Sequence, residues 1–287
     1  MIKYLPYKYD ILRNLAQVKR ILIIVAMETE ERALLANARP KRSVVGKPSE
    51  LKVDLKELKL SGLQVIVARS GVGPVNAGIL LTQILSSRKV DAVLLMGVAG
   101  ALDKKLRPGD VVISTQVIQH DSILSNGRQG RLIAPGELVL SLPKTKQIDP
   151  VMRCDSVLIK WALASIMTGR ANGVYRGTIL SGSEFVGSAE RKRKLRALTS
   201  DALAVDMEAS AVAQICRRLG LPFVAIKTIA DRANPGSSIP DDYTRFLKAA
   251  ADSGSSVLNG LMNGFEKTMR SAHLTTGRAG RRPVRRS

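Results

Sequence analysis

Residues 205–231 read VDMEASAVAQICRRLGLPFVAIKTIAD, and this stretch carries the clearest fold signal in the chain. Residues 206–219 predict a helix whose apolar residues share one side, namely Ala211, Val212, Ile215 and Leu219. Gly220 and Pro222 are typical of the end of a helix. The apolar run 223–229 follows at once and predicts a buried strand. A helix that leads directly into such a strand indicates an α/β fold.

The same alternation extends toward the N-terminus. Aliphatic and β-branched runs predict strands at 20–27, 64–69, 91–96, 110–117 and 177–181, and helical patterns cover 75–87 and 157–167. This order favours a single α/β domain built on a mixed, largely parallel twisted sheet. We expect the domain to span residues 20–265, between an N-terminal extension at 1–19 and a basic, disordered tail at 266–287.

Composition limits the class of protein and its location. A chain of 287 residues that is 45% hydrophobic can bury one substantial core. No apolar run approaches the roughly 18 residues of a membrane span. The first residues lack the apolar segment of a secretory signal. We therefore expect a cytoplasmic protein that does not enter a membrane.

Cysteine and histidine usage argues against metal and thiol chemistry. Cys154 and Cys216 lie far apart, with no CxxC pattern and no neighbouring histidine. His120 and His273 stand near no GxSxG nucleophile elbow. We expect reduced, partly buried thiols, no metal and no cofactor.

The net charge of +21 raises the possibility of a nucleic-acid partner. Residues 267–287 carry seven Lys or Arg and no acid, so part of the charge belongs to the tail. Aromatic residues make up only 3% of the chain, which leaves few side chains for base stacking. We expect at most weak, nonspecific contact between the basic tail and polyanions.

Acidic and glycine-rich segments follow several predicted strands. They are Glu28 to Glu31, Ser70 to Gly73, Gly97 to Gly100, and Asp231. Ligands of parallel α/β sheets bind at the carboxyl ends of the strands, so these segments are candidates for a site. Each alone has a structural explanation, because acids complement helix dipoles and glycines permit tight turns.

Taken together, these segments resemble the 5′-methylthioadenosine/S-adenosylhomocysteine nucleosidases, within the purine nucleoside and uridine phosphorylase superfamily. The resemblance covers about residues 20–265 and is carried by AMETE (26–30), SGVGPVNAG (70–78), GVAGAL (97–102), RPGDVV (107–112), SGSEF (181–185), VDMEASAVAQIC (205–216) and PFVAIKTIAD (222–231). It implies a nucleoside phosphorylase-like, three-layer α/β/α fold and a homodimer. It also implies hydrolysis of the N-glycosidic bond of an adenine nucleoside of the methylthioadenosine or adenosylhomocysteine type.

Three acids match the family's catalytic positions. The resemblance implies that Glu30 deprotonates the attacking water, that Glu208 accepts hydrogen bonds from ribose hydroxyls, and that Asp231 is the general acid at adenine N7. The chemistry agrees, since cleavage builds positive charge on the ribosyl ring while the base leaves as an anion. Such a site needs an acid near N7, acceptors near the sugar and, for hydrolysis, a base for water.

The resemblance also implies substrate-binding residues. Met207 contacts the ribose, Phe185 stacks on the base and the Val186 backbone reads the adenine edge, and the expected set is completed by Val98 and Tyr243. Several positions depart from the family, which usually has Ser or Thr at Val98, Gly at Ala101, Asp at Ser183, Arg at Lys227 and Ser at Ala230. The family's HD-x-DVTAFGY segment is replaced after His120-Asp121, which leaves the 5′ substituent open. We expect His120 itself to be structural.

Hydrolysis and phosphorolysis differ in the need for a phosphate site. Related phosphorylases carry Arg and Ser donors where this chain has Leu95 and Val98. Arg32 is predicted to be a solvated helix residue paired with Glu28. We therefore favour a hydrolase. The alternatives are a phosphate-dependent purine nucleoside phosphorylase, including the hopanoid-associated type, and a non-catalytic nucleoside- or nucleic-acid-binding protein.

Overall fold

A computed structural model describes residues 15–36, 38–45, 52–60, 62–125, 130–134, 150–166 and 173–232. Its strands are β1 (Arg20–Val25), β2 (Lys41–Val45), β3 (Val53–Leu60), β4 (Leu63–Arg69), β5 (Ala92–Ala101), β6 (Val111–Gln119), β7 (Ile123–Ser125), β8 (Gly130–Leu132), β9 (Val151–Arg153), β10 (Val174–Ser181), β11 (Ala202–Asp206) and β12 (Phe223–Ile229). Its helices are η1 (Leu15–Gln17), α1 (Glu28–Leu35), α2 (Pro74–Ser87), α3 (Ser156–Ile166), α4 (Ala189–Arg196) and α5 (Ala209–Leu219). Tyr243 and the predicted tail lie outside the described residues.

The central strands are apolar on both faces. β1 lies between β4 and β5, parallel to both, with Ile23 opposite Val67 on one side and Leu94 on the other. Five of its six residues are buried, as is typical of a parallel strand covered by helices on both sides. The β2 and β3 strands extend this sheet in antiparallel pairing at its far edge.

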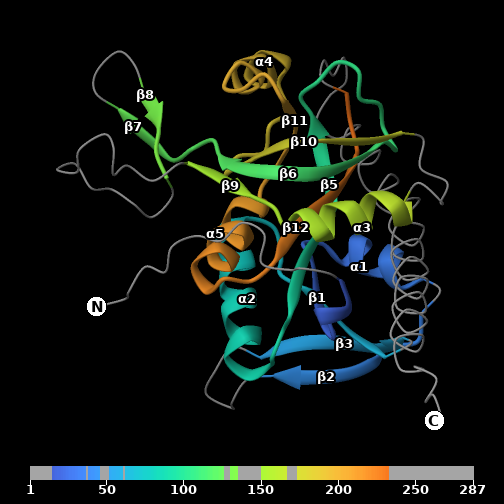
Figure 1. Cartoon of the computed structure of the whole chain (residues 1–287). Coiled ribbons are helices and arrows are strands. Elements are labelled where there is room, and N and C mark those ends of the chain that lie inside the picture. The colour runs from blue at the N-terminus through green and yellow to red at the C-terminus, as the bar shows by residue number, and fades with distance from the viewer. Residues whose placement is uncertain are drawn as a thin grey trace, which may run out of the picture.

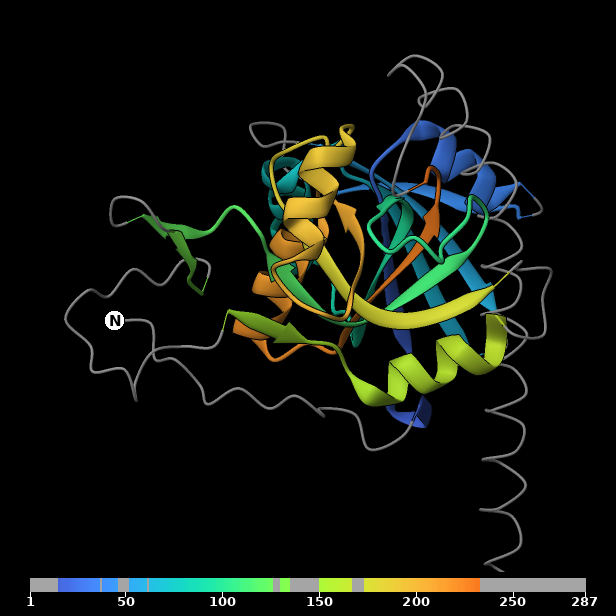
Figure 2. The same cartoon turned by 90° about the horizontal axis from the view of Figure 1, so that it is seen from above.

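Helices cover the sheet from two sides. Figure 1 shows α2 and α5 on one side of β1 and β12, with α1 and α3 on the other, and Figure 2 shows the same separation from above. The α2 and α5 helices also pack on each other. The expected three-layer α/β/α arrangement with a mixed sheet is confirmed.

At one end of the sheet the strands close into a ring. β11, β10, β6, β12 and β5 follow one another in the sheet, and β11 then pairs with β5 in antiparallel fashion, with Ala204 opposite Ala101. Gly177 permits the close approach of β10 and β11, because a Cβ atom there would lie 2.9 Å from the Asp201 carbonyl oxygen. The ring brings the ends of β5, β11 and β12 together.

The predicted elements are all present, but several boundaries are wrong. The strand predicted at 91–96 continues to Ala101, so the Gly97 to Gly100 segment lies inside β5 and not after it, and the strand predicted at 177–181 begins at Val174. The helix expected from Asp206 begins at Ala209 instead, because β11 runs through Asp206. Strands β2, β3, β7, β8, β9 and β11 and helices η1 and α4 were not among the predicted elements, and of α1 only the turn that pairs Arg32 with Glu28 was predicted. Cys154 and Cys216 are buried and free. No helix in the described part of the chain is long and apolar enough to cross a membrane.

Candidate active site

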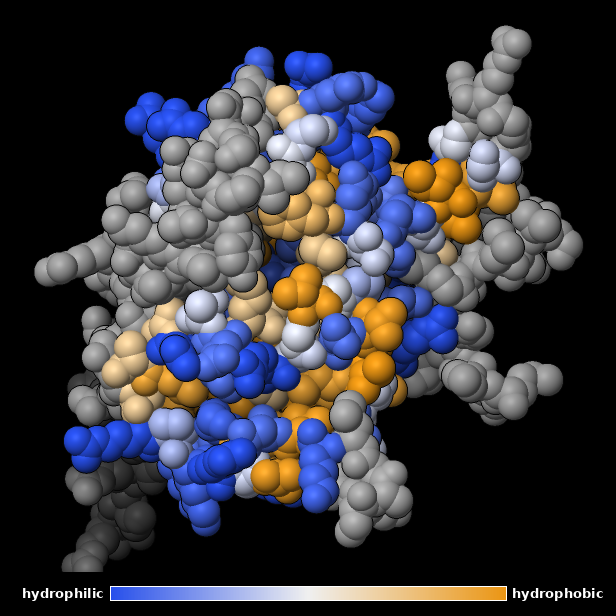
Figure 3. Space-filling view, turned by 180° about the vertical axis from the view of Figure 1, so that it is seen from behind, coloured by the Kyte–Doolittle hydropathy of each residue, from blue (hydrophilic) through white to orange (hydrophobic). Residues whose placement is uncertain are grey.

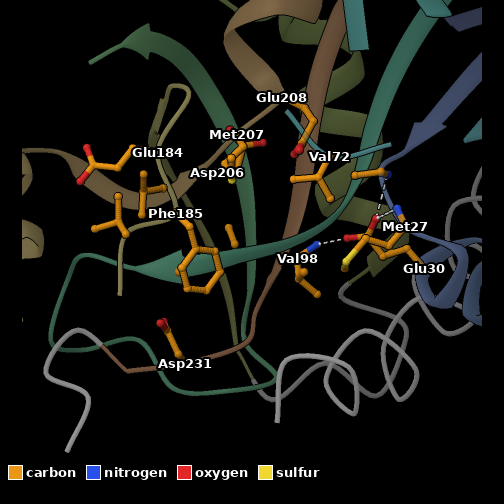
Figure 4. A pocket seen from close by; sticks show the side chains of 15 residues that line it. Met27, Glu30, Val72, Val98, Glu184, Phe185, Asp206, Met207, Glu208 and Asp231 are labelled. Carbon is orange, nitrogen blue, oxygen red and sulfur yellow. Dashed lines mark hydrogen bonds between the residues drawn. The ribbon is translucent and has the colours of Figure 1, made fainter. Parts of the chain in front are cut away.

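A cavity of about 480 Å³ lies where the ring of strands meets the start of α1 and α5. Its walls come from the β1–α1 connection, the loop before α2, the end of β5, the loop after β10, the β11–α5 connection and the residue Asp231 after β12. Among the predicted site residues, the lining includes Glu30, Val98, Phe185, Val186, Met207, Glu208 and Asp231. Figure 4 shows Asp231 and Phe185 at one end of the cavity and Glu30 with Met27 at the other.

Glu30 is held by three backbone donors. Its Oε2 atom accepts hydrogen bonds from the amides of Ala26 at 2.8 Å and Met27 at 2.9 Å. Its Oε1 atom accepts one from the amide of Val98 at 2.9 Å. Gly97 makes room for the carboxylate, because a Cβ atom at residue 97 would lie 2.9 Å from Glu30 Cδ. The carboxylate is therefore buried, fixed in direction and dependent on a glycine in β5.

A buried lysine supports the acids of the β11–α5 connection. Lys227 Nζ lies 2.9 Å from Asp206 Oδ2 and 3.6 Å from Glu208 Oε2, and the Lys227 side chain is 1% exposed. The amide of Gly73 donates to Glu208 Oε1 at 2.8 Å. These contacts fix Glu208 at the start of α5, facing the cavity (Figure 4).

The buried charges of Glu208 and Lys227 shift each other's pKa. Burial raises the pKa of Glu208 to about 6, although the nearby ammonium of Lys227 acts to lower it. Burial alone would lower the pKa of Lys227, but Asp206, Glu208 and Glu30 together raise it above its ordinary value. Lys227 therefore stays charged, while Glu208 changes its protonation state close to neutral pH.

Asp231 is bound on both carboxyl oxygens. The amide of Ala101 donates to Oδ1 at 2.8 Å, and Lys192 Nζ donates to Oδ2 at 2.5 Å. Lys192 comes from α4 and donates also to the carbonyl oxygen of Arg232 at 2.9 Å. Its side chain is only 1% exposed. The ion pair places a buried ammonium directly behind the carboxyl group at this end of the cavity.

The loop after β10 carries the exposed ring of Phe185 into the cavity. Arg191 Nε and Nη2 bind the two oxygens of Glu184 at 2.9 and 2.7 Å, and Asp121 accepts a hydrogen bond from the amide of Ser183 at 2.7 Å. His120 is buried behind Gly182 and is not among the lining residues.

The cavity wall is acidic and apolar. Five of the lining side chains are carboxylates, namely Glu30, Glu184, Asp206, Glu208 and Asp231, and the described lining includes no Arg, Lys, Ser or Thr. Val98 packs with Ala230 and Met27 beside Glu30. Leu95 is buried in the main core instead. Arg32 is exposed and pairs with Glu28, as predicted.

Sequence reasoning missed the lysines behind these acids. Lys192 lies in AERKRKLR, which reads as a solvated basic helix. One signal was available, because Lys192 and Leu195 stand three residues apart and so share a helix face. They are the buried residues of α4. Lys227 was noted only as a departure from the family's Arg.

Comparison with known proteins gives consistent matches. The model of a family described as the phosphorylase superfamily matches residues 20–263. A 5′-methylthioadenosine/S-adenosylhomocysteine nucleosidase of Marinomonas sp. (strain MWYL1) is 34% identical over 206 residues, covering 72% of this chain and 84% of the relative. The nucleosidase of the same name from Staphylococcus aureus (strain bovine RF122 / ET3-1) is 32% identical, covering 84% and 98%. The crystal structure of the Neisseria meningitidis nucleosidase with methylthio-immucillin-A superposes with a TM-score of 0.69 at 31% identity, covering 86% and 99%.

Proposed function

This chain belongs to the 5′-methylthioadenosine/S-adenosylhomocysteine nucleosidase family of the phosphorylase superfamily, and we propose that it hydrolyses the N-glycosidic bond of an adenine nucleoside. The products are adenine and a ribose derivative. The substrate class is the one in the relatives' names, methylthioadenosine and adenosylhomocysteine.

The acidic wall is the observation that supports hydrolysis over phosphorolysis. Phosphate is a dianion and needs Arg, Ser or backbone donors to enter a site. Here the lining side chains include five carboxylates and the described wall contributes no cationic side chain. The position beside Glu30 is occupied by the apolar side chains of Val98 and Ala230. Water can enter such a site, whereas a phosphate dianion would be repelled by it.

Glu30 is proposed to be the base for water. A carboxylate has about four lone-pair sites, and three of those on Glu30 accept backbone hydrogen bonds. The remaining site is on Oε1 and can accept a proton from water. Because the backbone fixes the carboxylate, the direction of that site is fixed as well.

Asp231 is proposed to be the general acid. As the C1′–N9 bond breaks, its electron pair moves to the purine, and N7 takes a proton from Asp231. The water oxygen bonds to C1′ and gives its proton to Glu30. Positive charge on the ribosyl ring is stabilised by the carboxylates of the β11–α5 connection, which include Glu208. Phe185 lies at the Asp231 end (Figure 4), where it can stack on the base, with Val186 beside it.

The other proposed substrate contacts follow from the same placement of base and ribose in the cavity. Met207 and Glu208 face the ribose, and Val98 lies against the sugar side of the cavity. Tyr243 keeps its proposed place among the substrate-binding residues, although it lies outside the described part of the chain. A cytoplasmic location is part of the same proposal.

A homodimer completes the proposal. Figure 3 shows apolar side chains gathered in patches among hydrophilic ones on the face seen from behind. Val72, Val75 and Ile79 are 49%, 71% and 46% exposed at the start of α2, and Val72 also lines the cavity. A second copy that covers these residues would close the cavity on that side. Light scattering should give twice the chain mass of 31.0 kDa, and a monomer alone would contradict the dimer.

The activity is tested by incubation with methylthioadenosine, adenosylhomocysteine, adenosine and inosine, with and without phosphate. We expect release of free adenine in phosphate-free buffer from at least one adenine nucleoside. Complete dependence on added phosphate would assign the chain to the phosphorylases instead. Binding without any release of base would indicate a non-catalytic protein.

A further inference from the structure

Two consecutive residues of helix α4 each bind an acid at the end of the cavity where the base is proposed to lie. Arg191 binds Glu184 in the loop that carries Phe185, and Lys192 binds Asp231 at the end of β12. The rest of the helix is largely solvated. Lys194, for example, is 66% exposed and pairs with Glu190 one turn away. Lys192, in contrast, is buried, so it does not belong to the solvated surface that the rest of α4 forms.

We propose that Lys192 is a positioning residue for cleavage, one that orients Asp231 and stabilises the negative charge that Asp231 acquires as its proton moves to the departing base. This inference rests on the proposed function and adds to it a residue of α4 that does not line the cavity.

The geometry fixes the Asp231 carboxyl group in one plane. Oδ1 is held by the Ala101 amide on β5, and Oδ2 by Lys192 Nζ. Lys192 Nζ is itself held by the carbonyl oxygen of Arg232. Its helix neighbour Leu195 is buried in an apolar cluster with Val186 and Val205. The ammonium therefore has little freedom to leave, and the carboxyl group it binds has little freedom to rotate.

The charges around Asp231 explain why a cation is needed there. Glu184, from the loop after β10, lines the same cavity. So do Asp206 at the end of β11, Glu208 from the β11–α5 connection and Glu30 from α1. Lys227 on β12 is engaged by Asp206 and Glu208. Lys192 is in direct contact with Asp231. Lys192 thus brings a positive charge to Asp231 in a cavity that four other acids also line.

The proposed role of Lys192 agrees with the movement of protons and electrons in the cleavage step. Asp231 transfers its proton to N7, the electron pair of the C1′–N9 bond goes to the purine, and Asp231 is left as a carboxylate. The Lys192 ammonium keeps its three protons and pairs with that carboxylate. A nearby opposite charge favours the ionised form of an acid, so the ammonium stabilises the carboxylate that remains once the proton has moved to N7.

The test replaces Lys192 with Met, which keeps the length of the side chain and removes its charge. We expect the kcat/KM of Lys192→Met for an adenine nucleoside to fall by about 10²-fold. Turnover of p-nitrophenyl riboside, whose leaving group needs no proton, should change far less. Lys192→Arg, which keeps the charge, should restore part of the activity.

Two further variants separate this role from a structural one. Lys194→Met is the matched control on the same helix and should behave as wild type. In an Asp231→Asn background, Lys192→Met should cause little further loss, because a residue that acts through Asp231 has nothing left to act on. The double variant also leaves no unpaired buried charge, so it is expected to fold even if Lys192→Met alone does not.

The outcomes are distinct from those that test the function. Equal losses of Lys192→Met on both substrates, no rescue by Lys192→Arg or additive losses in the double variant would each overturn the inference while wild-type adenine release stands. If the wild-type protein releases no adenine, the proposed function itself fails.

Discussion

Lys227 Nζ lies 2.9 Å from Asp206 Oδ2 in the interior, and both side chains are 1% exposed. The two residues belong to β12 and β11, which are not adjacent in the sheet order. We expect Lys227→Met to lower the free energy of unfolding by about 3–5 kcal/mol, since it leaves buried acids without their cation. Urea unfolding followed by circular dichroism measures this. A Lys227→Met/Asp206→Asn double variant should recover part of the loss, and an equal or larger loss would contradict the pairing.

Asp231→Asn should be rescued by a good leaving group. The variant cannot protonate N7, so we expect a loss of about 10²–10⁴ in the rate of adenine release. A substrate whose base leaves without protonation should recover part of that rate. Near-wild-type release of adenine by Asp231→Asn would show that the acid has been assigned wrongly.

Glu30→Gln should stay slow whichever base departs, because it affects the activation of water. The expected loss is again about 10²–10⁴ in rate. Adenine binding, measured by calorimetry, should persist because Glu30 lies at the opposite end of the cavity from Asp231 (Figure 4). Recovery with a good leaving group, as expected for Asp231→Asn, would remove the distinction between the two acids.

The pH profile should have an acidic limb near pH 6. Burial raises the pKa of Glu208 to about 6, so at lower pH the carboxyl group takes up a proton and loses acceptor capacity for the ribose hydroxyls. We therefore expect kcat/KM to fall as pH drops through about 6. In Glu208→Gln the overall rate should be lower and this limb absent. A limb that persists unchanged in the variant would have to belong to another group.

Gly97→Ala should disable the site through a single methyl group. That methyl carbon would come 2.9 Å from Glu30 Cδ, and Gly97 has a φ of 145°, which non-glycine residues rarely adopt. We expect loss of turnover together with a lower melting temperature. Gly78→Ala in α2 is the matched control, because its methyl group would meet Ile215 at 3.7 Å, an ordinary contact. Wild-type turnover in Gly97→Ala would show that Glu30 can shift without consequence.

The strands that could be predicted are those whose residues are buried on both faces. FVAIKTI in β12 is buried throughout and reads as a strand from its composition alone. Strand β3, VDLKELKL, carries alternating charges and pairs at the sheet edge, so its pattern lacks the continuous apolar run that was used as the signal. Strand β11 is also buried, but it is short and ends at Asp206, and that residue was assigned to the following helix.

The acids of the site could be predicted, whereas their partners could not. Glu30, Glu208 and Asp231 stand in motifs with a recognisable order. Lys192 pairs with Asp231, a residue 39 positions away, and the contact exists only because the fold brings α4, which packs on β11, next to Asp231. Lysine is almost never fully buried unless it is paired, so a sequence pattern places it on the surface.

The closure of the sheet through β5 and β11 has a consequence for how substrate preference can change. The Ala101 amide on β5 donates to Asp231, the proposed acid for the base. The residue paired with Ala101 is Ala204, which lies four residues before Glu208, the proposed ribose acceptor. The distance between the proposed acid for the leaving group and the proposed acceptor for the sugar is thus set by the register of β5 and β11. A slip of one residue in that register would turn the β11 side chains to the opposite face. Evolution therefore cannot change that distance in small steps. New substrates would have to be accommodated by the connecting segments, and every accepted ligand would share the same base-to-ribose geometry.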